Sequence, residues 1–154
     1  MNKRWKKNTV PMLAAGHPSV RYVATACGSY GLDFTNKIRR ALTIGGPTFI
    51  HSIDPCPKGW DYDPKYSHEL GMLAVETGIW VMYEIVDSEL VLNGPSRAIA
   101  RGIRKRKPVE EYLMRQGRFA HLTKEDIAFF QQRVDDSWEK WWIPGVVPFG
   151  MKEE

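Results

Sequence analysis

The sequence is poor in cysteine and has no long run of apolar residues. Its 154 residues include two cysteines, Cys27 and Cys56, too few for the disulfide framework of a small secreted protein. No apolar stretch approaches the roughly 20 residues that a membrane-spanning helix needs. The basic start at residues 1–7 is not followed by an apolar segment of signal-peptide type. We therefore expect a cytoplasmic protein without a membrane span.

The sequence also lacks the short motifs of common catalytic and nucleotide sites. It contains no P-loop, no G-x-G-x-x-G and no G-x-S-x-G pattern. A helical metal site needs two histidines four residues apart, and no pair has this spacing. We therefore expect no metal ligand among the four histidines, which are His17, His51, His68 and His121.

Composition and charge are those of an ordinary globular domain. Hydrophobic residues make up 43% and charged residues 26% of the chain, which is long enough to bury a core. Much of the net charge of +4 comes from the amino terminus and from one basic run. That run contains Arg101, Arg104, Lys105, Arg106 and Lys107. It contains no aromatic residue of the kind that stacks on nucleic acid bases, so a solvated arm or a contact with an acidic partner is the better interpretation.

Hydrophobic periodicity predicts an α/β fold in the first half of the chain. Residues 22–27 and 48–53 are β-prone runs bounded by turn signals. Between them, residues 32–44 carry apolar side chains at helical spacing. A strand, a helix and a strand with short joints favour a parallel pair with a right-handed crossover. The apolar side chains of the predicted helix are Phe34, Ile38, Ala41 and Leu42.

The following segments extend this pattern. Residues 54–63 contain prolines and a glycine and predict a loop, and residues 64–78 predict a helix. Residues 79–86 predict a third strand, and residues 89–92 a short return strand. Together these elements predict a three-layer α/β fold with a mostly parallel sheet and an antiparallel flap at its edge.

The last third of the chain predicts helices rather than strands. Residues 94–107 are polar and basic with little periodicity, so we expect a loop or an extended arm. Pro108 begins a helix that ends at Gly117. Thr123 and Asp126 have the spacing of a capping box at the start of the last helix. Its apolar stripe consists of Ile127, Phe130, Val134 and Trp138.

Cys56 is the strongest candidate for chemistry. It lies just after a predicted strand, between Pro55 and Pro57, and open parallel sheets bind ligands outside the carboxyl ends of their strands. The residues alone leave two interpretations: a ligand whose thiol is held in one direction, or a structural cysteine in a turn. Cys27 also ends a strand, but its neighbours are small, so we expect it to be structural.

Four groups of segments, taken together, resemble the beta subunits of 2-oxoacid:ferredoxin oxidoreductases. The resemblance extends from about residue 8 to about residue 142, and the third and fourth groups are the most specific. The groups are Val10-Pro11-Met12-Leu13-Ala14-Ala15-Gly16-His17 with Tyr22-Val23-Ala24-Thr25-Ala26; Gly46-Pro47-Thr48-Phe49-Ile50-His51; Pro55-Cys56-Pro57-Lys58-Gly59-Trp60; and Arg106-Lys107-Pro108-Val109-Glu110-Glu111-Tyr112-Leu113 with Gln116-Gly117-Arg118-Phe119.

The resemblance implies the C-terminal part of a thiamine-diphosphate-binding fold with a C-terminal helical extension. It implies oxidative decarboxylation of a 2-oxoacid such as pyruvate to acyl-coenzyme A and CO2. Electrons would pass through a [4Fe-4S] cluster to ferredoxin. The implied divisions are a partial cofactor domain, a basic arm, C-terminal helices and a tail, at residues 8–93, 94–107, 108–143 and 144–154.

The resemblance also implies cofactors and partners. The family binds thiamine diphosphate with Mg²⁺ and holds its cluster by cysteine thiolates. Cys56 matches the fourth cluster ligand, and no catalytic or thiamine-diphosphate-binding residue is carried over to this chain. The implied partners are the N-terminal half or the full context of the beta subunit, subunits of alpha, gamma and delta type, and ferredoxin. Neither a membrane nor nucleic acid is an expected partner.

Departures from the family pattern limit what the chain can do alone. The sequence lacks the C-x-x-C motif, the third cysteine, and the Gly-Asp-Gly segment with its downstream Asn. We therefore expect a fragment, a split-gene product or a chain begun at an internal methionine, inactive without a complementing polypeptide. Lys58 and the strand at residues 79–83 also differ from the commoner family versions. The alternative is a non-catalytic binding or scaffold fragment that uses the basic arm on an anionic partner.

Overall fold

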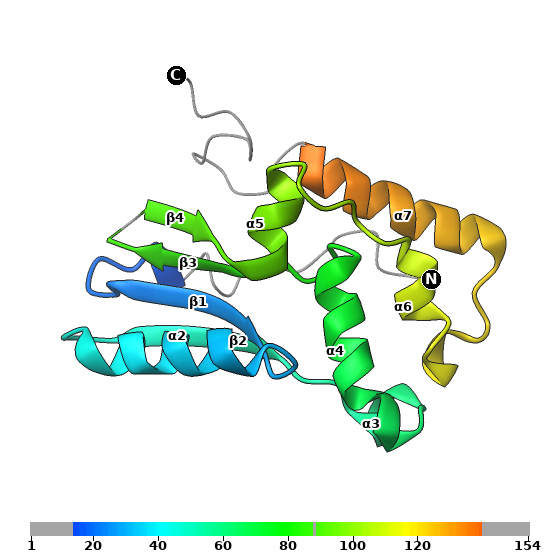
Figure 1. Ribbon diagram of the computed structural model, residues 1–154, viewed down its shortest axis with the longest axis horizontal. Coiled ribbons are helices and arrows are strands. Elements are labelled where there is room, and N and C mark those ends of the chain that lie inside the picture. Colours follow the sequence, from blue (N-terminus) through cyan, green and yellow to red (C-terminus); the bar gives the residue numbers. More distant parts are fainter. Residues whose placement is uncertain (1–13, 88, 140–154) are drawn as a thin grey trace.

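A computed structural model describes residues 14–87 and 89–139 of the chain (Figure 1). Pro11 and Gly16 also predict a short helix at residues 10–16, and most of it lies outside the described residues. The predicted tail at residues 144–154 lies outside them entirely. Within them the chain forms a four-stranded sheet with helices packed around it. The predicted α/β class, with helices at the C-terminal end, is confirmed.

The sheet has the strand order β2-β1-β3-β4. β1 (Tyr22–Cys27) and β2 (Thr48–Ile53) are parallel and are joined by α2 (Gly31–Thr43), so the predicted strand-helix-strand unit is confirmed. β3 (Tyr83–Val86) runs antiparallel to β1, and β4 (Glu89–Leu92) antiparallel to β3. The sheet is therefore mixed. Its parallel character lies in the β1–β2 pair, and β3 departs from the expectation of a mostly parallel sheet.

β3 begins at Tyr83 rather than at residue 79 because side chains occupy the preceding backbone groups. The Thr25 hydroxyl donates to the Val81 carbonyl at 2.7 Å and accepts from the Tyr83 amide at 2.9 Å. The Met82 amide donates to the hydroxyl of Ser96 at 2.9 Å. These bonds take the place of a strand ladder, which shortens the predicted strand to its last four residues.

The other helices lie around the end of the sheet at which β1 and β2 terminate (Figure 1). α4, α6 and α7 pack on one another through a buried apolar cluster that includes Leu70, Leu73, Leu113 and Val134. α4 is buried on more than one side, because Val75 packs in a second cluster with Cys27 and Met82. The elements are α3 (Pro57–Trp60), the 3-10 turn η1 (Pro64–Tyr66), α4 (Ser67–Glu76), α5 (Gly94–Ala100), α6 (Val109–Leu113), the 3-10 turn η2 (Gly117–Phe119) and α7 (Lys124–Glu139).

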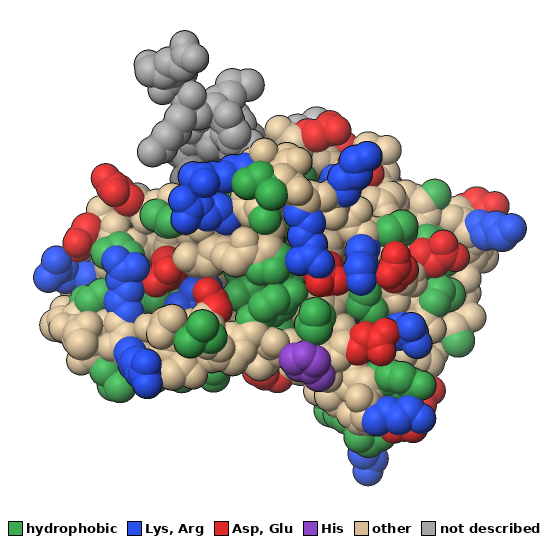
Figure 2. Space-filling view, in the orientation of Figure 1, with side chains coloured by type: hydrophobic (Ala, Val, Ile, Leu, Met, Phe, Trp, Pro, Cys, Tyr) green, Lys and Arg blue, Asp and Glu red, His purple; other side chains and the backbone are tan. Residues whose placement is uncertain are grey.

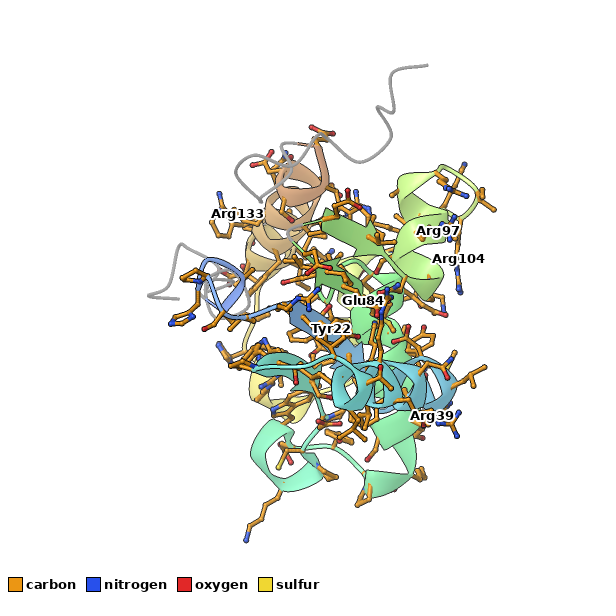
Figure 3. The ribbon with its side chains drawn as sticks, turned by 90° about the vertical axis from the view of Figure 1, so that its left-hand side faces the viewer. Tyr22, Arg39, Glu84, Arg97, Arg104 and Arg133 are labelled. Atoms are coloured by element: carbon orange, nitrogen blue, oxygen red, sulfur yellow. The ribbon has the colours of Figure 1, made fainter. Side chains whose placement is uncertain are left out.

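The two faces of the sheet are covered differently. On one face the Tyr22 hydroxyl donates to Glu84 at 2.7 Å (Figure 3). Arg40 of α2 donates to the same carboxylate at 3.2 Å. On the other face Val23 and Ile85 pack in an apolar cluster that Trp138 of α7 contacts. Because consecutive strand residues point to opposite faces, this arrangement gives the predicted three layers.

Two predicted loops contain helices. Residues 54–63 contain α3, because Pro57 supplies a preset backbone angle at the first helical position and the Cys56 side chain caps the helix. Residues 94–107 begin with α5, which has a proline in its first turn. The prediction of an extended basic arm was therefore wrong for residues 94–100. It overlooked that a proline can start a helix that lacks strong apolar periodicity.

The predicted capping box at the start of α7 is confirmed. The Thr123 amide donates to the Asp126 carboxylate at 3.1 Å, and the Asp126 amide donates to the Thr123 hydroxyl at 3.1 Å. These reciprocal bonds satisfy amides that the first helical turn leaves without partners. Within residues 14–87 and 89–139, no helix has the length and apolar character needed to cross a membrane.

Candidate functional site

The two cysteines lie near the carboxyl ends of the parallel strands β1 and β2, in different environments. Cys27 is opposite Ile53 in the parallel register, and Cys56 follows three residues after Ile53. Cys27 is buried, and its thiol donates to the Gly71 carbonyl at 3.4 Å. Burial raises the pKa of the Cys27 thiol. Cys27 is therefore a packed structural residue, as its small neighbours predict, whereas Cys56 is exposed.

The Cys56 sulfur lies at the start of α3. Its Sγ atom accepts a hydrogen bond from the Gly59 amide at 3.4 Å, and the Cys56 carbonyl accepts one from the Trp60 amide at 2.9 Å. An N–H group aimed at sulfur stabilises the negative charge that a metal-bound thiolate carries. The sulfur is thus oriented by the backbone and is open to a ligand from outside the described chain.

The absence of a side chain at Gly59 makes room for the Cys56 sulfur. A Cβ atom at position 59 would lie 3.3 Å from Cys56 Sγ and 3.8 Å from Cys56 Cβ. The first distance is tighter than ordinary van der Waals contact, so a side chain would push against the sulfur. Glycine at position 59 therefore allows the close approach between its backbone and the Cys56 sulfur.

The loop containing Cys56 is attached to the segment at residues 116–119. The Arg118 guanidinium lies 4.1 Å from the centroid of the Trp60 ring, and Tyr112 meets Trp60 edge-on at 6.5 Å. The Gly117 amide donates to the Asp61 carbonyl at 2.7 Å. The structure thus joins the two most specific segments of the sequence, which are more than 50 residues apart in the chain.

Asp61 has a left-handed backbone conformation that makes this attachment tight. Its φ is 57°, a conformation that few residues other than glycine, asparagine and aspartate adopt. A side chain at Gly117 would overlap the Asp61 carboxylate. The turn at Asp61 and the glycine at position 117 therefore fit each other, and together they hold the C-terminal end of the Cys56 loop.

In the described part of the chain, Cys56 is not surrounded by other side chains that could bind a metal ion. No group of three or more His, Cys, Asp or Glu side chains within residues 14–87 and 89–139 is arranged to hold a metal ion. Of the histidines, His51 meets the Trp80 ring edge-on at 4.9 Å, and His17 pairs with the hydroxyl of Ser19 at 2.8 Å. Within residues 14–87 and 89–139, Cys56 is therefore not part of a cluster of metal-ligating side chains.

The second candidate site, the basic run, is largely paired inside the molecule. Arg104 and Lys107 lie 2.6 and 2.9 Å from the buried carboxylate of Glu76, and Arg106 lies 2.7 Å from Asp135. Burial would raise the pKa of Glu76, but hydrogen bonds and charge from Lys107 and Arg104 lower it overall. The run lines an open hollow of about 470 Å³, yet three of its cations already have partners.

The sequence made Cys56 a candidate, but it did not predict the residues that position its loop. Gly59 carried a signal, since a glycine two positions after a proline indicates a close approach or a turn. Arg118 and Asp61 carried none, because a cation over a ring and a left-handed aspartate follow from tertiary contacts. The acids that neutralise the basic run were missed for the same reason, because Glu76 and Asp135 lie far from it in the sequence.

The chain is similar to subunits of known oxidoreductases. It is 51% identical over 132 residues to pyruvate synthase subunit PorB of Methanothermobacter marburgensis, covering 86% of this chain and 43% of that protein. The chain is 46% identical over 130 residues to pyruvate synthase subunit PorB of Methanocaldococcus jannaschii, and the match covers 84% of this chain and 41% of that protein. Ketoisovalerate oxidoreductase subunit VorB of Pyrococcus furiosus is 36% identical over 140 residues, covering 91% and 43% of the two chains.

These likenesses cover most of this chain but less than half of each relative. No family model matches the sequence. The chain spans about 43% of the length of the first of these relatives. Over this shared part, the chain is homologous to the beta subunits of 2-oxoacid:ferredoxin oxidoreductases, the family that includes pyruvate synthase subunit PorB and ketoisovalerate oxidoreductase subunit VorB.

Proposed function

We propose that this chain is the C-terminal half of a thiamine-diphosphate-binding beta subunit and supplies Cys56 as the fourth ligand of its [4Fe-4S] cluster. The observation that carries this proposal is the exposed Cys56 sulfur, which accepts a hydrogen bond from the Gly59 amide just after the end of β2. Sequence identity of 51% to a pyruvate synthase subunit supports it. In the assembled enzyme, a 2-oxoacid such as pyruvate is oxidatively decarboxylated to acyl-coenzyme A, and electrons pass to ferredoxin.

The residues present fit one cluster ligand. Pro55 and Pro57 restrict the backbone on both sides of Cys56, and the Gly59 amide stabilises charge on sulfur. Trp60, held by Arg118, fixes the end of the loop. This chain's own contribution is therefore to present one thiolate in a set direction, with little rearrangement when iron binds.

The rest of the site belongs to a complementing polypeptide. A cubane cluster held by protein needs about four thiolates, and Cys27 is buried under Gly71. The cluster would carry electrons away from the reaction, while thiamine diphosphate and Mg²⁺ would be bound mainly by the N-terminal half. We infer that this chain is inactive alone and works with that half, with subunits of alpha, gamma and delta type, and with ferredoxin.

The proposal is tested on the assembled complex, isolated through a tag on this chain. Cys56→Ser is expected to lower the iron content and to remove most of the thiolate-to-iron absorption in the visible range, because a serine hydroxyl is a poor ligand for such clusters. Cys27→Ala is the matched control, since it removes the other thiol from a buried position. Iron content and absorption that are unchanged in Cys56→Ser would show that the ligand assignment is wrong.

A further inference from the structure

Arg118 is a partly buried cation that has no acidic partner in the described part of the chain. It lies in η2, and none of the ion pairs in that part of the chain includes it. Lys37 and Arg106, which are also buried or partly buried, each have a carboxylate partner. Figure 2 shows Lys and Arg side chains interleaved with Asp and Glu over one face of the molecule. Charges that leave water are normally paired with an opposite charge, so Arg118 departs from the rule that these other cations follow.

The groups around Arg118 do not neutralise its charge. Burial lowers the pKa of Arg118, and Tyr112 and Tyr62 act in the opposite direction. Tyrosine hydroxyls are neutral near pH 7, and an arginine keeps its proton there. The Asp61 carboxylate lies against Gly117 but forms no ion pair with the guanidinium. Arg118 is therefore charged, partly desolvated and without a counter-ion among the described residues.

Contacts with neighbouring side chains fix the Arg118 guanidinium in one position. Its Nε donates to the Gln116 side-chain oxygen at 2.9 Å, and Gln116 is 1% exposed. Its Cζ atom lies 4.1 Å from the centroid of the Trp60 ring and 4.6 Å from that of the Phe119 ring. Aromatic faces attract a cation through their quadrupole but carry no net charge. The two rings therefore hold the charge in place without cancelling it.

The fixed charge is attached to the turn that presents Cys56. Trp60 is the last residue of α3, and its amide donates to the Cys56 carbonyl at 2.9 Å. The Gly117 amide donates to the carbonyl of Asp61, the residue directly after Trp60, at 2.7 Å. Arg118 is thus joined to the turn by a ring contact and by the backbone of the residue before it. Its charge therefore keeps a set position relative to the Cys56 thiol.

We propose that Arg118 balances the charge of the cluster that Cys56 helps to hold and so raises the reduction potential of that cluster. The inference rests on the proposed function, which places a cluster at Cys56. Thiolate ligands give such a cluster a net negative charge, and the electron added on reduction increases it. A nearby cation attracts the more negative, reduced form more strongly than the oxidised form. Arg118 therefore favours the transfer of an electron from the 2-oxoacid reaction to the cluster.

A packing role alone does not require an arginine at this position. An unbranched neutral side chain such as methionine could fill the space between Trp60 and Phe119, and it would avoid the cost of removing a charge from water. That cost is offset when an anion comes next to the guanidinium. The exposed Cys56 sulfur, on the turn that Arg118 contacts, is the place at which this chain offers a site for such an anion.

The inference is tested by redox titration of the assembled complex, isolated through a tag on this chain and followed by electron paramagnetic resonance of its reduced clusters. The cluster at Cys56 is identified as the signal that Cys56→Ser removes. Arg118→Met removes the charge and keeps an unbranched side chain for the two rings. It is expected to make reduction of this cluster about tenfold less favourable, which lowers the midpoint potential by about 59 mV for one electron. A midpoint potential equal to that of the wild type would overturn the inference.

Two further variants separate the charge of Arg118 from its packing. Arg118→Lys keeps the charge without the planar group and is expected to restore most of the potential that Arg118→Met loses. A potential as low as that of Arg118→Met would show that stacking on the rings is what matters, and the inference would be wrong. Arg118→Gln, which can still donate to Gln116, is the neutral variant to use when the methionine variant does not assemble, and the same lowering of the potential is expected.

Arg115→Met is the matched control for the loss of a positive charge. Arg115 lies three residues before Arg118 and pairs with Glu69 at 2.9 Å, and both side chains of this pair are about half exposed. Solvent and salt screen exposed charges, so the midpoint potential is expected to stay at the wild-type value. A shift as large as that of Arg118→Met would assign the effect to net charge and would remove the specific role of Arg118.

The two proposals fail in different ways. A signal that Cys56→Ser removes, with a potential that Arg118→Met leaves unchanged, takes away the role of Arg118 and keeps Cys56 as a ligand. A signal that survives in Cys56→Ser, with a potential that Arg118→Met lowers, takes away the ligand assignment and keeps Arg118 as the cation beside a cluster. An assembled complex that contains no iron overturns both proposals.

Discussion

The environment of the Cys56 sulfur is set by groups within a few residues of it. Pro55 and Pro57 restrict the backbone, the Gly59 amide donates to Sγ, and the Trp60 amide donates to the Cys56 carbonyl. The prolines and the strand before them could be recognised in the sequence. The hydrogen bond to sulfur could not, because it depends on four residues adopting a helical turn.

Gly59→Ala is expected to destabilise cluster binding without unfolding the chain. The added Cβ would lie 3.3 Å from Sγ, so the sulfur must shift from its position. Substitutions next to metal ligands typically cost tenfold or more in metal affinity, and we expect iron to be lost to a chelator roughly tenfold faster.

Gly45→Ala provides the comparison for Gly59→Ala, because a Cβ at Gly45 meets no other atom within 4 Å. Both variants replace glycine by alanine, and only one of them crowds the sulfur. Equal rates of iron loss from the two variants, measured by absorbance after chelator addition, would argue against a role for Gly59 in positioning Cys56.

The elements that hold the fold together are tied by contacts between distant segments. α4 carries the buried Glu76, which binds Arg104 and Lys107 from the segment after α5. Trp138 of α7 donates to the Gly78 carbonyl at 3.0 Å, just beyond α4. Periodicity predicted α4 and α7 as helices. It could not pair them with their neighbours, because ion pairs and indole hydrogen bonds are not periodic signals.

Glu76→Gln is expected to lower the free energy of unfolding at neutral pH by about 2 kcal/mol, because it removes one partner of a buried charge cluster whose cations are partly exposed. The folded-state pKa of Glu76 is lowered below its ordinary value of 4.5. Its contribution is therefore present above that value and is lost as the pH falls through the folded-state pKa. The difference between wild type and variant should disappear in acid, as measured by denaturant unfolding at several pH values.

Glu69→Gln is the matched control on the same helix. Glu69 pairs with Arg115 at 2.9 Å, and both side chains are about half exposed. Exposed pairs contribute little, so the expected change is below about 1 kcal/mol. A loss of stability as large as that of Glu76→Gln would mean that burial is not the source of the Glu76 effect.

At the scale of the whole molecule, the charges of the basic run are paired with acids more fully than the linear sequence indicates. The net charge is +4, but Arg104, Arg106 and Lys107 are paired with acids from α4 and α7. An extended basic arm would have left all of these cations open to an anionic partner. Folding removes much of the field on which the alternative function as an anion-binding fragment depends.

Binding to single-stranded DNA is therefore expected to be weak and only mildly dependent on salt. If the internally paired cations make no phosphate contacts, about two of the five basic residues of the run remain, so the run should contribute no more than about two to the slope of log affinity against log salt. Fluorescence anisotropy with an oligothymidine measures this slope. A slope that falls by about five when the five residues of the run are neutralised would show that the internal pairs open and that the alternative function applies.

The sequence by itself determined the strand-helix-strand unit, the capping box of α7 and the position of Cys56 at the end of a strand, because these features depend on periodicity and on neighbouring residues. Tertiary structure decided the antiparallel direction of β3, the start of β3 at Tyr83 and the pairing of the basic run. It also decided which face of α2 is buried, since Lys37 points inward and Leu42 outward. These features arise from hydrogen bonds and charges between residues far apart in the chain, which no local pattern records.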